Sequence, residues 1–214
     1  MFATDVRDRV PSTWQMDSAA APGLIAAGSL WVMIFVVMIG VGLATGQTLS
    51  ADSMSNLPLA TQTYFALQHV STVILDLGLL GLCARLHGRA RRLGLSAATL
   101  AVMGVALGLT VLLLAPIDDP TRIDSPSGVV AAVANPLGAV ATLLATSLLG
   151  LASVRTHCLH LAAGLTLVVV GIATMPILFA TPLPIGPAWL TDTLAFVLSG
   201  FGYIAVGVSA RARR

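Results

Sequence analysis

Long apolar stretches alternate with short polar stretches along most of this chain. A helix needs about 20 apolar residues to cross the ~30 Å hydrocarbon core of a bilayer, and each of these stretches reaches that length. The pattern predicts six transmembrane helices, at residues 23–45, 63–84, 93–115, 128–154, 159–180 and 188–210. The expected fold class is an all-α, polytopic membrane bundle of six helices.

Composition supports the membrane class. Of the 214 residues, 57% are hydrophobic and 9% are charged, whereas about 25% of residues are charged in soluble domains. A water-soluble fold could not bury so much apolar surface, so the expected partner is the lipid bilayer. Aromatic residues make up only 5% of the chain, too few for the stacking platforms that bind nucleic acid, and no nucleic-acid partner is predicted.

The arginines predict the orientation. All basic charge comes from 11 arginines, because the chain contains no lysine. If both termini are cytoplasmic, ten arginines lie inside and only Arg122 lies outside, as the positive-inside rule requires. The expected topology in the plasma membrane has a cytoplasmic tail at 1–21 and a cytoplasmic, arginine-rich end at 211–214. A cleaved signal peptide is the alternative for the first segment, but its apolar run is longer than such peptides need.

Polar residues inside the second apolar stretch are the strongest functional lead. Gln62, His69, Asp76 and Cys83 follow one another at seven-residue spacing, which places them in one stripe along a helix face. Ionisable side chains are costly in the bilayer, by at least ~2.5–3.5 kcal/mol, so His69 and Asp76 are expected to face protein or water. Asp76 is expected to be the neutral acid at pH 7, because burial disfavours the carboxylate and no cationic side chain lies at its depth. It either carries a proton or cation or fastens helices together.

Two residues of other helices are expected at a similar depth. Asn135, followed by Pro136, lies between the levels of His69 and Asp76, and Asp192 lies near the level of His69. Together these residues predict an outward-opening polar pocket between the helices at 63–84, 128–154 and 188–210. Asp192 has a second interpretation, as a helix-start residue that caps free backbone amides.

No cofactor and no metal site is predicted. His87, His157 and His160 lie at the cytoplasmic boundary rather than at the depth of His69, which argues against a haem held by two histidines. The spacing His157-Cys158-x-His160 matches no standard zinc pattern.

The basic link between the second and third helices contains a separate set of candidate residues. Its four arginines are candidates for contact with anionic lipid head groups: Arg85, Arg89, Arg91 and Arg92.

Motifs typical of enzymes are missing from the sequence: it has no G-x-S-x-G elbow, no H-E-x-x-H and no phosphate loop. The sequence therefore favours a membrane protein with a structural or accessory role, without predicting an activity. Two alternatives stay open. One is a small solute or proton-coupled carrier that uses Asp76, His69 and Asn135. The other is a haem- or metal-binding membrane protein.

Three short motifs resemble those of small six-helix bacterial membrane proteins for which no activity is established. They are R-A-R-R-L-G at 89–94, L-L-G-L-A-S-x-R at 148–155 and G-x-G-Y-x-x-x-G at 200–207. The resemblance implies the six-helix architecture and assigns no functional residue. A fourth motif, Gly104-x-x-x-Gly108, predicts a close approach between two helix backbones.

Overall fold

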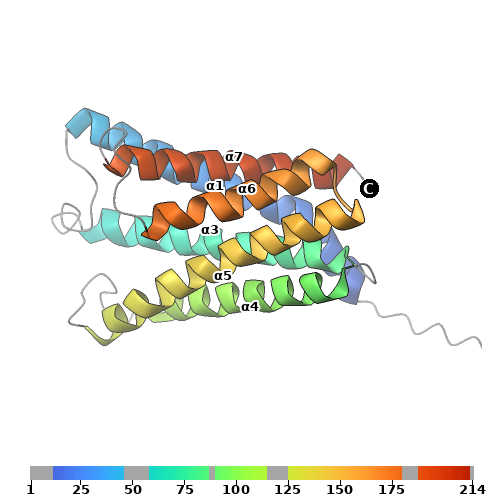
Figure 1. The fold of residues 1–214 in the computed structure, drawn as a ribbon. Helices are drawn as coiled ribbons and strands as arrows, with labels where there is room; N and C mark the ends of the chain where they lie inside the picture. The colour runs from blue at the N-terminus through green and yellow to red at the C-terminus, as the bar shows by residue number, and fades with distance from the viewer. Residues whose placement is uncertain (1–11, 46–57, 87–89, 115–124, 180–187, 213–214) are drawn as a thin grey trace, which may run out of the picture.

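Six helices make up the regular structure of the protein in a computed structural model, which describes residues 12–45, 58–86, 90–114, 125–179 and 188–212 (Figure 1). The helices are α1 (Ser12–Thr45), α3 (Pro58–Ala84), α4 (Arg91–Leu114), α5 (Pro126–Thr156), α6 (Leu161–Phe179) and α7 (Ala188–Ala212). Within the described ranges, all regular secondary structure is helical, which confirms the all-α prediction.

Four of these helices are long and apolar enough to cross a membrane. The apolar spans are Ala20–Gly40, Ala66–Ala84, Arg91–Leu114 and Pro126–Thr156. In α6 and α7 the described apolar parts are shorter, at Leu161–Pro176 and Phe196–Ala212. Large apolar side chains cover the outer surface, as Leu113 and Leu198 show with 71% and 69% exposure, while Asp76 is fully buried. This distribution is the reverse of that in a water-soluble protein and supports an integral membrane protein.

The first helix begins earlier than the apolar pattern predicts. α1 starts at Ser12, within the stretch expected to be a polar tail, and continues through Pro22. Alanines at positions 19–21 favour the helical conformation, so the helix extends beyond the apolar span at Ala20–Gly40.

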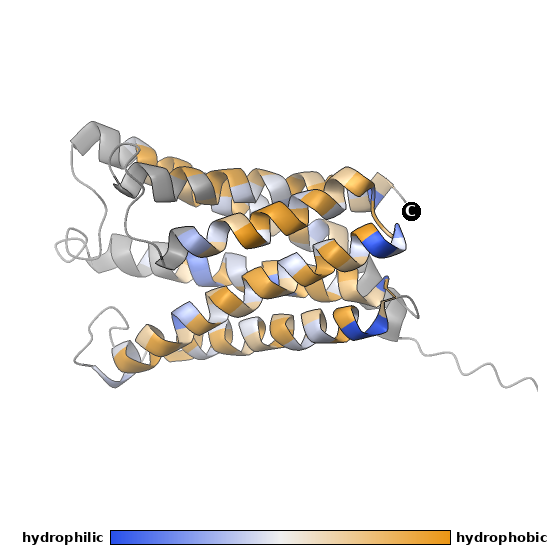
Figure 2. Ribbon diagram, viewed as in Figure 1, coloured by the Kyte–Doolittle hydropathy of each residue, from blue (hydrophilic) through white to orange (hydrophobic). Residues whose placement is uncertain are grey.

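The helices form a closed ring in which successive helices run in opposite directions (Figure 1). α1 contacts α3 and α7, α3 contacts α4, α4 contacts α5, α5 contacts α6, and α6 contacts α7. α3 and α5 also touch across the ring. Hydrophilic residues gather at the end of the bundle where α3 and α5 end and α4 begins (Figure 2).

Glycines divide this ring into two halves. In the first half, α1 packs between α3 and α7, where a Cβ on Gly23 would lie 3.0 Å from Gly78 Cα and one on Gly28 would lie 2.5 Å from the Gly200 carbonyl oxygen. In the second half, α5 packs between α4 and α6, and a Cβ on Gly150 would lie 2.6 Å from a backbone nitrogen of α6. At these contacts the backbones are so close that only glycine fits.

Side chains, rather than backbones, meet the glycines where the two halves join. Between α3 and α4, a Cβ on Gly108 would lie 2.9 Å from Val73 Cγ2. Between α6 and α7, a Cβ on Gly202 would lie 2.8 Å from Val170 Cγ2. Close backbone contacts at glycine therefore join α1 to α3, α1 to α7 and α5 to α6, whereas the described glycines of α4 meet side chains.

Candidate functional site

A cavity of about 130 Å³ lies between the two halves of the ring. All six helices contribute to its wall. The lining residues are Trp31, Gln68, His69, Thr72, Gly104, Gly108, Ala134, Asn135, Gly138, Ala139, Thr142, Leu143, Thr174 and Phe196. The cavity is thus a feature of the whole bundle rather than of one helix pair.

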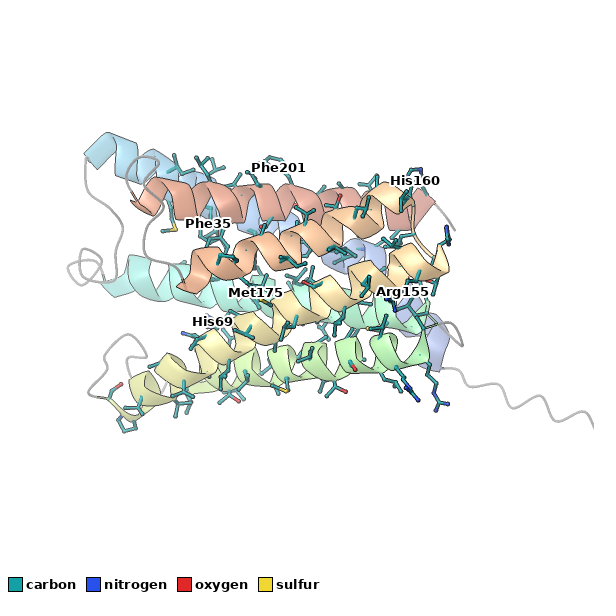
Figure 3. All side chains as sticks on the ribbon, in the orientation of Figure 1. Phe35, His69, Arg155, His160, Met175 and Phe201 are labelled. Atoms are coloured by element: carbon teal, nitrogen blue, oxygen red, sulfur yellow. The ribbon has the colours of Figure 1, made fainter. Side chains whose placement is uncertain are left out.

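His69 and Asn135 form one side of the cavity. The Nε2 atom of His69 on α3 lies 2.7 Å from Oδ1 of Asn135 on α5, which is a hydrogen-bond distance. Because an amide oxygen only accepts hydrogen bonds, the Nε2 position carries the proton in this pair. Figure 3 shows His69 in the part of the bundle that lies away from Arg155. The structure therefore joins two of the residues that the sequence predicts at a similar depth.

Asp76 lies roughly 10 Å further along α3 and contacts two residues of the cavity wall. Its Oδ2 atom lies 3.0 Å from Oγ1 of Thr142 on α5 and directly against Gly104 of α4, where any side chain would overlap it. The close approach at Gly104 thus admits a carboxyl group, whereas the glycine spacing had predicted a contact between two helix backbones.

The hydrogen bonds that Thr142 can form depend on whether Asp76 is protonated. Thr142 Oγ1 also lies 3.0 Å from the carbonyl oxygen of Gly138, but a hydroxyl group has only one proton to donate. Both contacts are complete hydrogen bonds at the same time when Asp76 is protonated, since Asp76 then donates to Thr142 and Thr142 donates to Gly138. Oδ1 of Asp76 is buried and has no hydrogen-bond partner among the described residues.

Two further polar pairs connect the halves. Oγ1 of Thr146 on α5 lies 3.2 Å from the hydroxyl oxygen of Tyr203 on α7, and Oγ1 of Thr174 on α6 lies 3.0 Å from Oγ of Ser199 on α7. All four side chains are buried. Thr174 also lines a groove of about 620 Å³ on the outer surface between α6 and α7, so it separates the cavity from the lipid-facing side.

Two aromatic residues, Trp31 and Phe196, also belong to the cavity wall. Trp31 of α1 meets Phe196 of α7 edge-on, with ring centroids 5.6 Å apart, and meets Tyr203 edge-on at 5.8 Å. The Nε1 atom of Trp31 is buried without a hydrogen-bond partner in the described part of the chain. A buried indole N–H is usually paired, so this donor is an exception in the described part of the chain.

The remaining candidate residues lie elsewhere. Asp192 is part of α7, but its side chain, like that of Gln62, lies outside the described part of the structure. Arg85 donates from Nη1 to the carbonyl oxygen of Ala210 at 2.8 Å, and so binds the end of α7. Arg91 and Arg92 are exposed in the first turn of α4, and Arg89 lies outside the described residues.

The histidines and cysteines do not gather at one place within the described ranges. No group of three His, Cys, Asp or Glu side chains lies close enough to hold a metal ion there. His157 and His160 lie at the α5–α6 turn, far along the bundle from His69 (Figure 3), and His87 lies outside the described residues.

Trp31, Thr142 and Phe196 are among the cavity-lining residues that the sequence analysis missed. A signal for one of them was present, because Asn135 and Thr142 repeat the seven-residue spacing of His69 and Asp76. Both pairs are 66 positions apart, which is the pattern expected when two parallel helices lie side by side in one register.

Comparisons of the chain with protein-family profiles, with curated proteins and with solved structures found no match.

Proposed function

We propose that this protein is a small-solute carrier of the plasma membrane and that the central cavity is its binding site. The observation that carries the proposal is a cavity to which all six helices contribute and whose wall includes the hydrogen-bonded pair His69 and Asn135. The sequence alone favours a structural or accessory role. A bundle with only that role has no need for a cavity that all six helices share and that polar side chains partly line, so the cavity favours the carrier alternative.

The proposed topology has six spans with both termini in the cytoplasm. The described arginines support it, because all of them lie at one end of the bundle: Arg85, Arg91, Arg92, Arg155 and Arg211. In the alternating arrangement of Figure 1 the ends of α3, α5 and α7 share this end with the start of α4. A cytoplasmic position of this end satisfies the positive-inside rule.

The cavity suits a small amphipathic molecule. Its volume of about 130 Å³ is close to that of engineered protein cavities that hold benzene, so a ligand of roughly six non-hydrogen atoms fits. Among the lining residues, His69, Asn135 and Thr142 offer hydrogen bonds, and Trp31 and Phe196 offer apolar aromatic surface. A molecule with one polar and one apolar part can use both kinds of contact at once.

Asp76 supplies the proposed coupling to protons. In the empty site the carboxyl group is protonated and donates to Thr142, which completes the hydrogen bonds described above. When the proton leaves to water, the hydroxyl of Thr142 turns from Gly138 to donate to the new carboxylate. Thr142 lines the cavity, so a solute that donates to Thr142 Oγ1 competes with the protonated carboxyl group of Asp76 and favours the carboxylate, to which Thr142 donates. Solute binding and proton release therefore favour each other.

The test uses purified protein in liposomes that contain a fluorescent pH indicator. A panel of small alcohols, amides, amines and phenols of four to seven non-hydrogen atoms, chosen for the cavity size of about 130 Å³, is applied as outward and inward gradients. At least one solute is expected to change the internal pH with the wild type but not with Asp76→Asn. Two results together would contradict the proposal: solute movement that is the same in protein-free liposomes, and failure of cysteines placed at 69 and 135 to react with an impermeant maleimide. The protein would then be a packed bundle with a structural role.

A further inference from the structure

A second hollow, of about 610 Å³, lies at the arginine-rich end of the bundle, remote from the central cavity. The start of α4 forms one side, with Arg91 and Arg92, and the end of α5 forms the other, with Arg155 and His157. Figure 2 shows the hydrophilic patches at this end of α4 and α5, and Figure 3 labels Arg155 there. Two segments more than sixty positions apart in the sequence therefore direct basic residues to one place.

The three arginines of this hollow lack a described counter-charge. Arg91, Arg92 and Arg155 make no hydrogen bond or ion pair with any residue that the structure describes, whereas Arg85 of the same link donates to the Ala210 carbonyl. The one carboxylate whose side chain is described is Asp76, which is buried in the middle of α3. Three like charges around one hollow repel each other unless an anion lies between them.

Backbone conformation adds hydrogen-bond donors to the same hollow. Ala90 and His157, which both line the hollow, have positive φ angles of 51° and 56° at the start of α4 and just after the end of α5. Helical pairing at α4 begins with the bond from Gly94 N to Ala90 O, so the preceding amides have no partner within the helix. Ala90 has no side-chain oxygen to cap them, in contrast to Ser125, which accepts from Gly128 N at the start of α5.

We propose that this hollow binds a phosphate group, held by Arg91, Arg92 and Arg155 and by the free amides at the start of α4. Guanidinium groups match the paired oxygens of phosphate, and free amides at a helix start add to the attraction for an anion. The phosphate belongs either to an anionic lipid head group, since the hollow lies at the edge of the membrane-spanning region, or to a free phosphate ion. The site adds Arg155 to the arginines of the α3–α4 link and does not depend on the function proposed for the central cavity.

Short-chain phosphatidic acid and inorganic phosphate are the two probes, each titrated into the full-length protein in a neutral detergent. Arg155→Gln is the test variant. Arg211→Gln is the matched control, because Arg211 is exposed at the same end of the bundle but does not line the hollow. Arg155→Lys keeps the charge and serves as the check that changes are not caused by misfolding.

Binding of phosphatidic acid, followed by native mass spectrometry, is expected to weaken about fivefold in Arg155→Gln, as the loss of one near-surface cation implies, and less than twofold in Arg211→Gln. Arg155→Lys is expected to lie between the wild type and Arg155→Gln. If inorganic phosphate displaces the lipid, or alone shows the fivefold loss, the site accepts the free ion. If inorganic phosphate neither displaces the lipid nor shows this loss, the lipid head group is the ligand of the site. Equal losses in the Arg155 and Arg211 variants, or no loss with either probe, would overturn the proposal.

Discussion

Replacement of Gly104 by alanine tests the packing around Asp76. The new Cβ would overlap Asp76 Oδ2 and would lie 2.8 Å from Asp76 Cγ and 2.9 Å from Thr142 Oγ1. To restore an ordinary contact of 3.4 Å, Asp76 Cγ must move from 2.8 Å by about 0.6 Å. A shift of that size away from Thr142 would stretch the 3.0 Å bond beyond hydrogen-bond length.

The expected cost follows from these contacts. Overpacking in a close-packed interior costs about 1–3 kcal/mol, and the lost hydrogen bond adds about 1 kcal/mol. Alanine has a higher helix propensity than glycine, which offsets up to about 1 kcal/mol of this cost. Gly104→Ala is therefore expected to lower the free energy of unfolding by about 1–3 kcal/mol. Gly94→Ala is the control on the same helix, because its Cβ would lie 3.6 Å from Leu86 Cδ1, an ordinary contact. That control is expected to be neutral or slightly stabilising.

The free energy of unfolding of both variants is measured in mixed micelles. Tryptophan fluorescence follows unfolding as the fraction of denaturing detergent is increased. A double-mutant cycle with Asp76→Ala identifies the cause, because removal of the carboxyl group leaves room for the new methyl group. In the Asp76→Ala background the cost of Gly104→Ala is expected to fall by about 1–2 kcal/mol. If Gly104→Ala unfolds at the same midpoint as Gly94→Ala, or costs the same with and without Asp76, the described contact is wrong.

Three further outcomes are expected. Asp76→Asn keeps the shape of the neutral acid and is expected to unfold within about 1 kcal/mol of the wild type, whereas Asp76→Arg inserts poorly, as the yield of membrane-integrated protein will show. Cysteines at His69 and Asn135, in a variant without the natural cysteines, are expected to react with an impermeant maleimide added from outside; protection of both would contradict a wet cavity. A phosphatase fused after Arg214 is expected to be inactive and one fused at Thr121 active, and the reverse would invert the proposed topology.

The helices were predictable because the bilayer imposes a simple requirement on the sequence. A helix that crosses the hydrocarbon core must be apolar over about 20 residues, and polar links must separate such stretches. Asn135 and His69 were likewise predictable as neighbours, because depth along a helix can be counted from its ends. Depth sets the level of a residue but not the direction in which its side chain points.

Direction depends on which helices are neighbours, and here the sequence analysis lacked the necessary information. Thr142 received no role because its partner Asp76 is identified only once α3 and α5 are known to touch. Trp31 looked like one apolar residue among many, since its buried N–H becomes notable only when no acceptor faces it. The position of Arg85 at the end of α7 depends on ring closure in the same way, because its acceptor is 125 residues away.

The division of the ring into two glycine-packed halves has a mechanical consequence. The four side-chain hydrogen bonds described above between α3 and α5, α5 and α7, and α6 and α7 all cross from one half to the other. A rocking movement of one half against the other would break these bonds and separate Gly108 from Val73 and Gly202 from Val170, while the backbone contacts at Gly23, Gly28 and Gly150 would stay intact. At about 1 kcal/mol for each bond, the loss of these four bonds alone would place such a tilted state at least about 4 kcal/mol above the closed one, a population of at most roughly one molecule in a thousand. A solute that replaces two or three of these bonds in the tilted state raises that population by a factor of tens to hundreds.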